Sequence, residues 1–453
     1  MNISEKSLGN KKLFALLALP LAVAVSITIT EVKWMYGAAI LLAPLLLYLS
    51  FKRPFIFPFG IYVFSIPFEN ILIMNGAKHG PTLTRLLGIL AIIAILLKGL
   101  YEKRLKAPGK INLWWVLFSF YCILSTLWGI SAEFPLVRIV TIIGLAGLYL
   151  VASTYQVTKQ EYDYLKWFLV SGGLLSAVLT IIAYHQGLLE LGEAERVSMM
   201  SLDNGGGMGL VNKQAFDMLL PFSICIGMIF ERRKPIFTGF LFITFLLIFF
   251  SMMITGSRGG LAAGLAALFY FIFSKRDKLK SIIIAGLILM VTFAMTPQFY
   301  LDRINRSLAT GASGRFDIWH VGMKALGKYW LFGAGLDCFP NAYTEFVNYT
   351  PVYMGLDRAP HNVFIGSFVE LGIIGGMLLL TALFMHYLAI GPSKKGGSND
   401  QSILKAAFWA ILVGSLTQDV LWYKSFWLLW MMIVMLKNSE NGLASPFQAA
   451  QNA

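Results

Sequence analysis

The residues of this chain best suited to chemistry are arginines in short turns between strongly apolar segments. The clearest case is TGSRGG, residues 255–260, where Arg258 stands between FLFITFLLIFFSMMI and LAAGLAALFYFIF. Gly259 and Gly260 open the second segment, whose first amide groups and positive dipole end favour an anion. Glycine also lets an anionic group approach the backbone closely. The stretch predicts half of a phosphate-sized site, and a plain tight turn is the alternative.

Histidine is the second candidate. His361 stands where a polar stretch gives way to an apolar one in APHNVFIGSFVELGIIGG. An imidazole there can accept a proton near neutral pH or hydrogen-bond an attacking or leaving oxygen. A hydrogen bond that starts the next helix is the competing interpretation. His320 lies in a helical pattern and is assigned a structural role.

Carboxylates in or beside apolar segments are functional candidates by default. Glu370 and Asp217 are of this kind, and pairing with an arginine of a neighbouring helix is the alternative. Asp419 and Lys424 lie near the last turn and are expected to pair with each other.

Neither a metal site nor redox chemistry is predicted. The longer polar loops contain no DxD pair, no HExxH and no Cys/His cluster, and Cys122, Cys225 and Cys338 lie far apart. Arginines can stabilise a diphosphate leaving group without a metal. We therefore expect neither a metal nor another cofactor.

Composition predicts an all-α polytopic integral membrane protein. Of the 453 residues, 57% are hydrophobic and 13% are charged, whereas a soluble domain has about 25% charged residues. Mean hydropathy is +0.70. The formal charge of +14 is divided among short basic clusters instead of forming one basic face, which argues against a nucleic-acid partner.

We expect about 12 to 14 transmembrane helices in one membrane domain, residues 1–453. The candidate spans cover approximately residues 13–30, 35–50, 54–72, 86–100, 113–130, 136–154, 164–185, 214–230, 236–254, 259–273, 281–296, 363–389, 403–418 and 421–436. Every second loop is basic, as in FKRP, KGLYEKRLKAPGK, ERRKP, SKRDKLK and GPSKKGG. By the positive-inside rule both termini are therefore cytoplasmic.

Two outward loops are long enough to carry structure, a smaller one at 186–213 and a larger one at 297–362. The larger loop is expected to be mostly helical. Its SGRFDIWHVGMKALGKYW stretch has Ser313 as a possible N-cap and apolar residues at helical spacing. These are Phe316, Trp319, Met323 and Leu326. We predict an amphipathic helix at the outer membrane interface.

Arginines on the outer side require a reason, because short outward loops are depleted in positive residues. They are Arg196, Arg258, Arg303, Arg306, Arg315 and Arg358, with Arg85 and Arg138 near the outer ends of spans. A planar, permanently charged guanidinium binds phosphate with two parallel hydrogen bonds. Snorkelling to headgroups, or pairing with a loop carboxylate, is the competing interpretation for each.

Three motifs resemble the O-antigen ligase and polymerase superfamily, the WaaL- and Wzy-type proteins that share the Wzy_C region. They are TGSRGG, GRFDIWHVGMKAL followed by WLFGAGLDCF (314–339), and PHNVFIGSFVELGIIGG (360–376). The motifs cover residues 190–385, which the resemblance identifies as a Wzy_C-like catalytic region. This chain has LVNKQAF where many members have an NPN segment, so Asn212 lacks the flanking proline.

The resemblance implies a GT-C-like fold in the bacterial inner membrane and an active site on the periplasmic side. The activity it implies is inverting, metal-independent transfer of a glycan from undecaprenyl pyrophosphate to an acceptor hydroxyl. His361, Arg258 and Arg315 would be catalytic. Arg196, Arg258, Arg315, Gly259 and Gly260 would bind the pyrophosphate.

Several activities stay open. A ligase would use lipid A-core as acceptor, and we favour it over a polymerase, which would use a second lipid-linked glycan. A transporter of lipid-linked glycans would instead predict internal repeats and broken helices with charges near the midplane. A structural scaffold would not require arginines around glycine turns.

Overall fold

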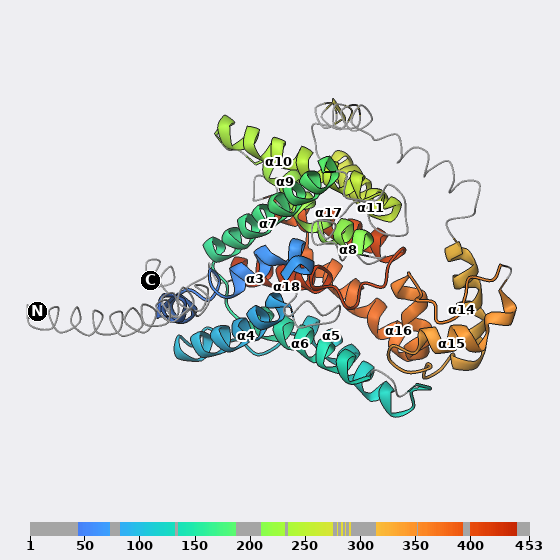
Figure 1. Ribbon diagram of the computed structural model, residues 1–453. Coiled ribbons are helices and arrows are strands. Elements are labelled where there is room, and N and C mark those ends of the chain that lie inside the picture. Colours follow the sequence, from blue (N-terminus) through green and yellow to red (C-terminus); the bar gives the residue numbers. More distant parts are fainter. Residues whose placement is uncertain are drawn as a thin grey trace, which may run out of the picture.

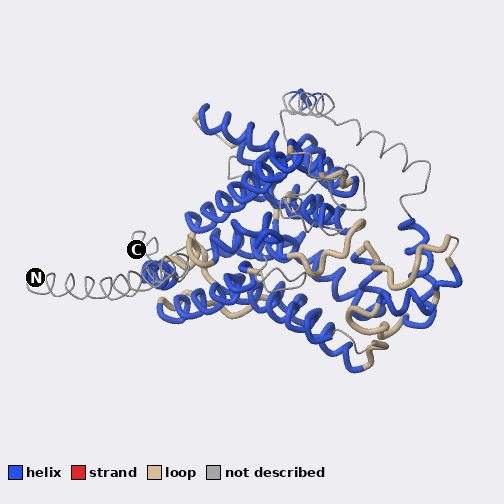
Figure 2. Tube along the Cα trace, in the orientation of Figure 1, coloured by secondary structure: helices blue, strands red, loops and turns tan. Residues whose placement is uncertain are grey.

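The computed structural model of the protein describes residues 44–72, 82–131, 135–186, 210–231, 234–274, 314–350, 352–392 and 399–441, with a few positions between 279 and 290. Across these residues the regular structure is helical, without strands, and an isolated bridge joins Leu105 to Tyr155. The helices form one bundle (Figures 1 and 2). The expected all-α polytopic architecture is confirmed.

The helices follow the predicted apolar segments closely. Their bounds are α3 (Phe59–Ser65), η1 (Ile66–Leu72), α4 (Leu83–Tyr101), α5 (Lys110–Leu124), η3 (Ser125–Leu127), α6 (Pro135–Thr154), α7 (Lys159–His185), α8 (Leu210–Asp217), α9 (Leu219–Ile229), α10 (Pro235–Ile254), α11 (Arg258–Ser274), α14 (Arg315–Tyr329), α15 (Phe339–Glu345), η6 (Val347–Tyr349), α16 (Val363–Ile390), α17 (Asp400–Ser415) and α18 (Lys424–Asn441).

Six helices of the described part are long and apolar enough to cross a membrane, which makes this a multi-pass membrane protein. They are α4, α5 with η3, α6, α7, α10 and α16. The segments at 59–69 and 258–274 form shorter apolar helices. The spans expected at 13–30 and 281–296 lie wholly or largely outside the described residues, so the total of about 12 to 14 stays a prediction.

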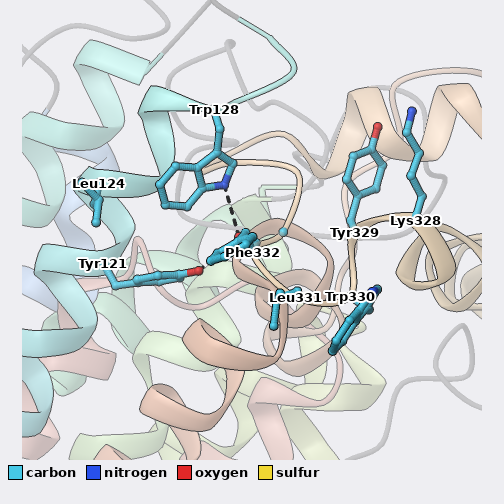
Figure 3. Close-up of a pocket in the computed structure, with 9 residues that line it drawn as sticks. Tyr121, Leu124, Trp128, Lys328, Tyr329, Trp330, Leu331 and Phe332 are labelled. Atoms are coloured by element: carbon cyan, nitrogen blue, oxygen red, sulfur yellow. Dashed lines mark hydrogen bonds between the residues drawn. The ribbon is translucent and has the colours of Figure 1, made fainter.

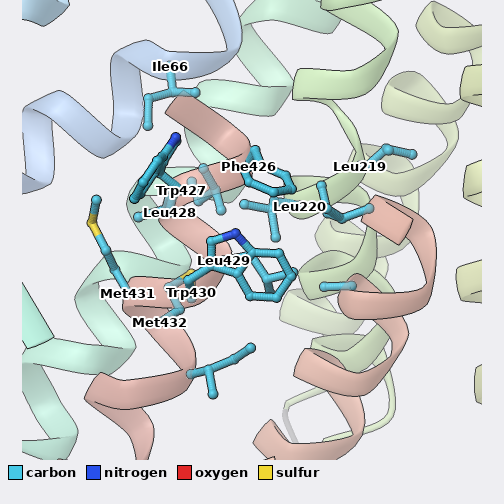
Figure 4. Close-up of a cluster of buried hydrophobic side chains, with 14 of the residues drawn as sticks. Ile66, Leu219, Leu220, Phe426, Trp427, Leu428, Leu429, Trp430, Met431 and Met432 are labelled. Atoms are coloured by element: carbon cyan, nitrogen blue, oxygen red, sulfur yellow. The ribbon is translucent and has the colours of Figure 1, made fainter. Parts of the chain in front are cut away.

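The last helix, α18, forms the centre of the bundle, where it packs against α6, α7, α16 and α17. Its own large apolar side chains project from it in several directions (Figure 4). Trp427 and Trp430 are fully buried, and the Trp115 ring of α5 lies 4.8 and 5.8 Å from them. A helix that is apolar all round must be buried in this way.

The single span expected at 214–230 consists of two helices, α8 and α9, which meet at Met218. Pro221 explains the break. Its ring clashes with the carbonyl four residues earlier, and it has no N–H for the helix. The break places Asp217 at the end of α8.

The long helix α16 is interrupted at Gly372, which has φ 63° and ψ −168°, a conformation open almost only to glycine. The chain that follows α14 bonds the backbone groups freed by the break. Trp330 O accepts the Ile373 N–H at 2.7 Å, and Ala334 N–H donates to Val369 O at 2.9 Å. The break therefore anchors residues 330–335 to the membrane helices.

Helices α14 and α15 lie at one end of the bundle, on the right of Figure 1, which we name the α14 end. The predicted helix is confirmed, but its N-cap is Gly314 rather than Ser313. The face of α14 that packs on α16 carries Ile318, Val321 and Ala325. Two residues of the predicted apolar stripe, Phe316 and Met323, are instead 59% and 58% exposed. They form a second apolar face of α14, separate from the buried one.

Candidate functional site

The turn that carries Arg258 joins α10 to α11. Gly256 adopts φ 65°, which a side chain would disfavour. Ser257 Oγ accepts the Gly260 N–H at 3.3 Å, the pattern of a serine that caps a helix. Helix α11 consequently begins at Arg258 itself, with both glycines in its first turn.

Both glycines allow close packing of protein against the start of α11. A Cβ at Gly259 would clash with the Thr417 hydroxyl, and a Cβ at Gly260 would lie against the Ala215 Cβ. Thr417 belongs to the turn between α17 and α18, which we name the 416–423 turn, and Ala215 belongs to α8. The glycines therefore press the Arg258 turn against two elements far away in sequence.

A second pair of segments brings Arg315 to His361. Arg315 is the first residue of α14, after Gly314 at φ 75°. One turn later, Trp319 Nε1 donates to Pro360 O at 2.9 Å, which fastens the residue before His361 to α14. The charge of Arg315 acts on the imidazole as a result.

The His361 ring stays available for chemistry. Asn362 makes the hydrogen bonds that start α16, since its Oδ1 accepts the Phe364 and Ile365 N–H groups at 2.9 and 3.1 Å. That helix-start role was the competing interpretation for His361. Within the part of the chain that the structure describes, the imidazole makes no hydrogen bond.

Burial, together with the positive charges of Arg315 and Arg358, lowers the pKa of His361 to about 4. The ring is therefore neutral at pH 7, as a proton acceptor must be. His361 itself has φ 47°, a conformation in which histidine is several times more frequent than most residues.

The 416–423 turn neighbours the Arg258 turn, through Thr417, and Arg315, through Tyr423. Gln418 Nε2 donates to Asn212 O at 2.9 Å, and the Tyr423 hydroxyl donates to Gln418 Oε1 at 3.2 Å. Arg315 lies within electrostatic range of Tyr423. The 416–423 turn thus lies against the start of α11, where Arg258 stands, and within electrostatic range of Arg315, a proximity that their separation in sequence does not show.

Two carboxylates, Asp419 and Asp337, lie in or beside the same turn. Arg138 binds Asp337 at 2.8 Å and stacks over the Trp422 ring at 4.3 Å. Trp422 Nε1 donates to Asp419 at 2.9 Å, and burial raises the pKa of Asp419 to about 6. The expected pair of Asp419 with Lys424 is wrong.

Lys424 belongs instead to a buried network of two lysines and two carboxylates. Lys213 bridges Glu69 and Asp217 at 2.6 Å each, Lys424 pairs with Glu69, and the Ser425 hydroxyl donates to Asp217. The charges balance, which makes burial tolerable. Asp217 therefore pairs with a lysine, Lys213, rather than an arginine. The spacing of Lys213 and Asp217 four residues apart could have indicated this network.

The structure describes some of the remaining predicted site residues and not others. Glu370 accepts the Phe339 N–H at 3.2 Å and so helps to anchor the chain after α14. Arg196 lies outside the described residues. Within those residues no group of three or more His, Cys, Asp or Glu side chains could hold a metal ion.

Comparison with known families identifies the middle of the chain. Residues 243–380 match the family model Wzy_C, described as O-antigen ligase. This region belongs to the O-antigen ligase/polymerase superfamily. No curated protein matches the chain significantly.

The Wzy_C match contains Arg258, Arg315 and His361. Two elements contact the Arg258 turn, α8 and the 416–423 turn. One precedes the matched region in the sequence and the other follows it. A ligase- or polymerase-type function in the membrane is supported, and the candidate site spans more of the chain than the Wzy_C match.

Proposed function

We propose that this protein transfers a glycan from undecaprenyl pyrophosphate to an acceptor hydroxyl, with inversion, as an O-antigen ligase. The observation that carries the proposal is the neutral imidazole of His361 beside the guanidinium of Arg315. A base and a fixed positive charge close enough to act on each other are what this reaction needs, because a hydroxyl must lose a proton while a diphosphate gains negative charge.

The proposed step is a single displacement. The acceptor oxygen attacks the anomeric carbon, the bond from that carbon to the phosphate oxygen breaks, and undecaprenyl pyrophosphate leaves with the bonding electrons. His361 takes the hydroxyl proton. Arg258 and Arg315 bind the phosphates, with Arg196 and the Gly259 and Gly260 amides as further proposed contacts.

We place the α14 end on the periplasmic side of the inner membrane, with both chain termini in the cytoplasm. The basic loops support this orientation, because α16 starts beside α14 and the basic stretch GPSKKGG follows the other end of α16 in the sequence. We extend the catalytic region 190–385 by the 416–423 turn, which contacts Gly259.

A transporter was the alternative from another class, and one of its predicted features is present. Helix α16 is broken, with Glu370 two residues from the break. Residues 330–335 bond the freed backbone groups, whereas a transporter uses such groups to bind its substrate. The break thus supports a rigid attachment of α14 more than a transport site.

Reconstitution of the full chain with a defined undecaprenyl pyrophosphate glycan tests the proposal. We expect glycan transfer to lipid A-core. A product extended on a second lipid-linked glycan would indicate a polymerase, and no product with either acceptor would contradict an enzyme of this type. Chelation of divalent metals should leave the rate unchanged. Arg258→Ala and Arg315→Ala should each lower the rate about 10²- to 10³-fold with normal membrane insertion.

A further inference from the structure

A cavity of about 530 Å³ lies at the α14 end, away from the Arg315 and His361 pair. We name it the aromatic pocket (Figure 3). One wall comes from α5 and the residues after it, and the other from the end of α14. The main lining residues are Tyr121, Leu124, Trp128, Tyr329, Trp330 and Phe332. The volume is within the range of cavities that hold small ligands.

Four polar side-chain groups of the aromatic pocket are bonded to protein atoms. The Tyr121 hydroxyl and Trp128 Nε1 both donate to Phe332 O at 3.3 Å. At the rim, Lys328 and the Tyr329 hydroxyl both bind Glu345 at 2.5 Å. What faces the cavity is ring and aliphatic surface, which suits hydrocarbon better than the hydroxyl groups of a sugar.

The pocket continues the lipid-facing surface of α5. This helix is a candidate membrane span, and Leu113, Leu117 and Phe120 are exposed along one side of it. Their spacing of four and three residues places them on one stripe, and Leu124 extends that stripe into the pocket. A lipid chain that lies along α5 would therefore reach the pocket without leaving apolar surface.

Helix α14 connects the aromatic pocket to the candidate site. It has Arg315 at its first residue and Tyr329 at its last. At 1.5 Å per residue these positions are about 20 Å apart. A molecule whose one end is held in the pocket could therefore reach His361 with a group about 20 Å from that end.

We propose that the aromatic pocket binds the acceptor glycolipid where its acyl chains join its first sugars. This inference rests on the proposed function. It adds that the acceptor is anchored by its lipid, at a distance that leaves room for several sugars before the attacked hydroxyl. Such an acceptor matches a ligase rather than an enzyme whose acceptor sugar adjoins a pyrophosphate.

Leu124→Trp, which fills the pocket, tests this, with Leu90→Trp at an exposed position of α4, outside the pocket and the α5 stripe, as the control. With the reconstituted full chain, Leu124→Trp should raise the KM of the acylated acceptor about tenfold or more, as the loss of two buried methylene groups would. The KM of a deacylated core oligosaccharide should not change. An equal rise for both acceptors would show a sugar pocket and overturn the proposal.

A second measurement does not depend on transfer. A glycolipid acceptor with a diazirine in one acyl chain should label residues 121–128 and 328–332 in the full chain and in Leu90→Trp, and label them at least about fivefold less in Leu124→Trp. Phe332→Ala, which leaves more space, replaces Leu124→Trp if that variant fails to insert. Equal labelling by a photoreactive phospholipid, or no loss in the pocket variant, would overturn the proposal. Labelling without any transfer would instead refute the proposed function alone.

Discussion

Helix α16 carries a histidine near each end, and the two differ in what their ring nitrogens do. His386 is fully buried, with Nε2 bonded to the Tyr149 hydroxyl at 2.9 Å and Nδ1 to Ala382 O at 2.8 Å. His361 is partly exposed, and its ring makes no hydrogen bond to any residue that the structure describes. The residue type is the same, but only the second ring can still accept a proton.

The surroundings of the two rings also differ, since apolar groups enclose one and cations lie near the other. Aromatic rings enclose His386, with Trp115 at 6.1 Å and Trp430 at 5.6 Å. Cations of Arg315 and Arg358 act on His361. A ring enclosed by apolar groups stabilises the core, whereas a neutral ring beside cations can receive a proton as an anion forms.

The strongest test of this comparison is removal of the ring at the start of α16. His361→Ala should lower the transfer rate about 10²- to 10⁴-fold, because a proton acceptor is lost. His320→Ala, an exposed histidine on α14, is the control and should retain full activity. If the two variants have comparable activity in a reconstituted assay, His361 is not part of the active site.

A smaller effect is expected when His361 keeps its ring but loses its support. Trp319→Phe removes the hydrogen bond to Pro360 O and lets the segment move, so kcat should fall about tenfold. The donor KM should change little, since Trp319 is not proposed to touch the donor. Met323→Leu, on the exposed face of the same helix, is the control. A change confined to the donor KM would contradict a positioning role.

The opposite result is expected at the far end of α16. His386→Phe leaves the Tyr149 hydroxyl buried without its partner, which should lower the free energy of unfolding by about 1 to 3 kcal/mol. Transfer per folded molecule should stay within about twofold of the original. Thermal unfolding and activity measured on one preparation would separate the two effects. A loss of activity as large as that of His361→Ala would erase the contrast.

The smallest effect concerns pH. Because the pKa of His361 is lowered to about 4, its neutral form persists down to that pH, and kcat/KM should fall only below it. Arg358→Gln removes one of the cations, so the pKa rises and the acid limb moves toward the ordinary value of 6.5. Lys106→Gln makes the same charge change far away and should leave the limb in place. An acid limb already at 6.5 in the original protein would show that another group controls it.

Most of the helices could be predicted from local pattern. The apolar runs from α4 to α7 and from α10 to α11 agree with the structure within a few residues, because each helix satisfies its own backbone and faces lipid. The break of α8 from α9 was missed although Pro221 signals it. The break of α16 could not be read as such, since glycine in an apolar helix has several uses.

The candidate site was partly predictable for a similar reason. Arg258 and Arg315 are predicted because positive charges on the outer side of membrane helices need a purpose, and His361 because a histidine at the start of an apolar segment can accept a proton. The roles of Trp319, Gln418 and Tyr423 were missed, because a tryptophan in an apolar stripe or a polar residue in a short turn has no distinctive local pattern. Their contribution lies in contacts with distant segments.

The sequence alone determined a multi-pass helical membrane protein with its positive charges in particular turns, because hydrophobic length and charge act residue by residue. Tertiary structure decided which turns meet. It placed the Arg258 turn against Thr417, fastened His361 to α14 through Trp319, and gave Asn362 rather than His361 the role of starting α16. It also bonded both nitrogens of His386, so that one of two histidines near α16 became part of the core. These outcomes depend on partners up to 237 residues away along the chain, and no local pattern encodes them.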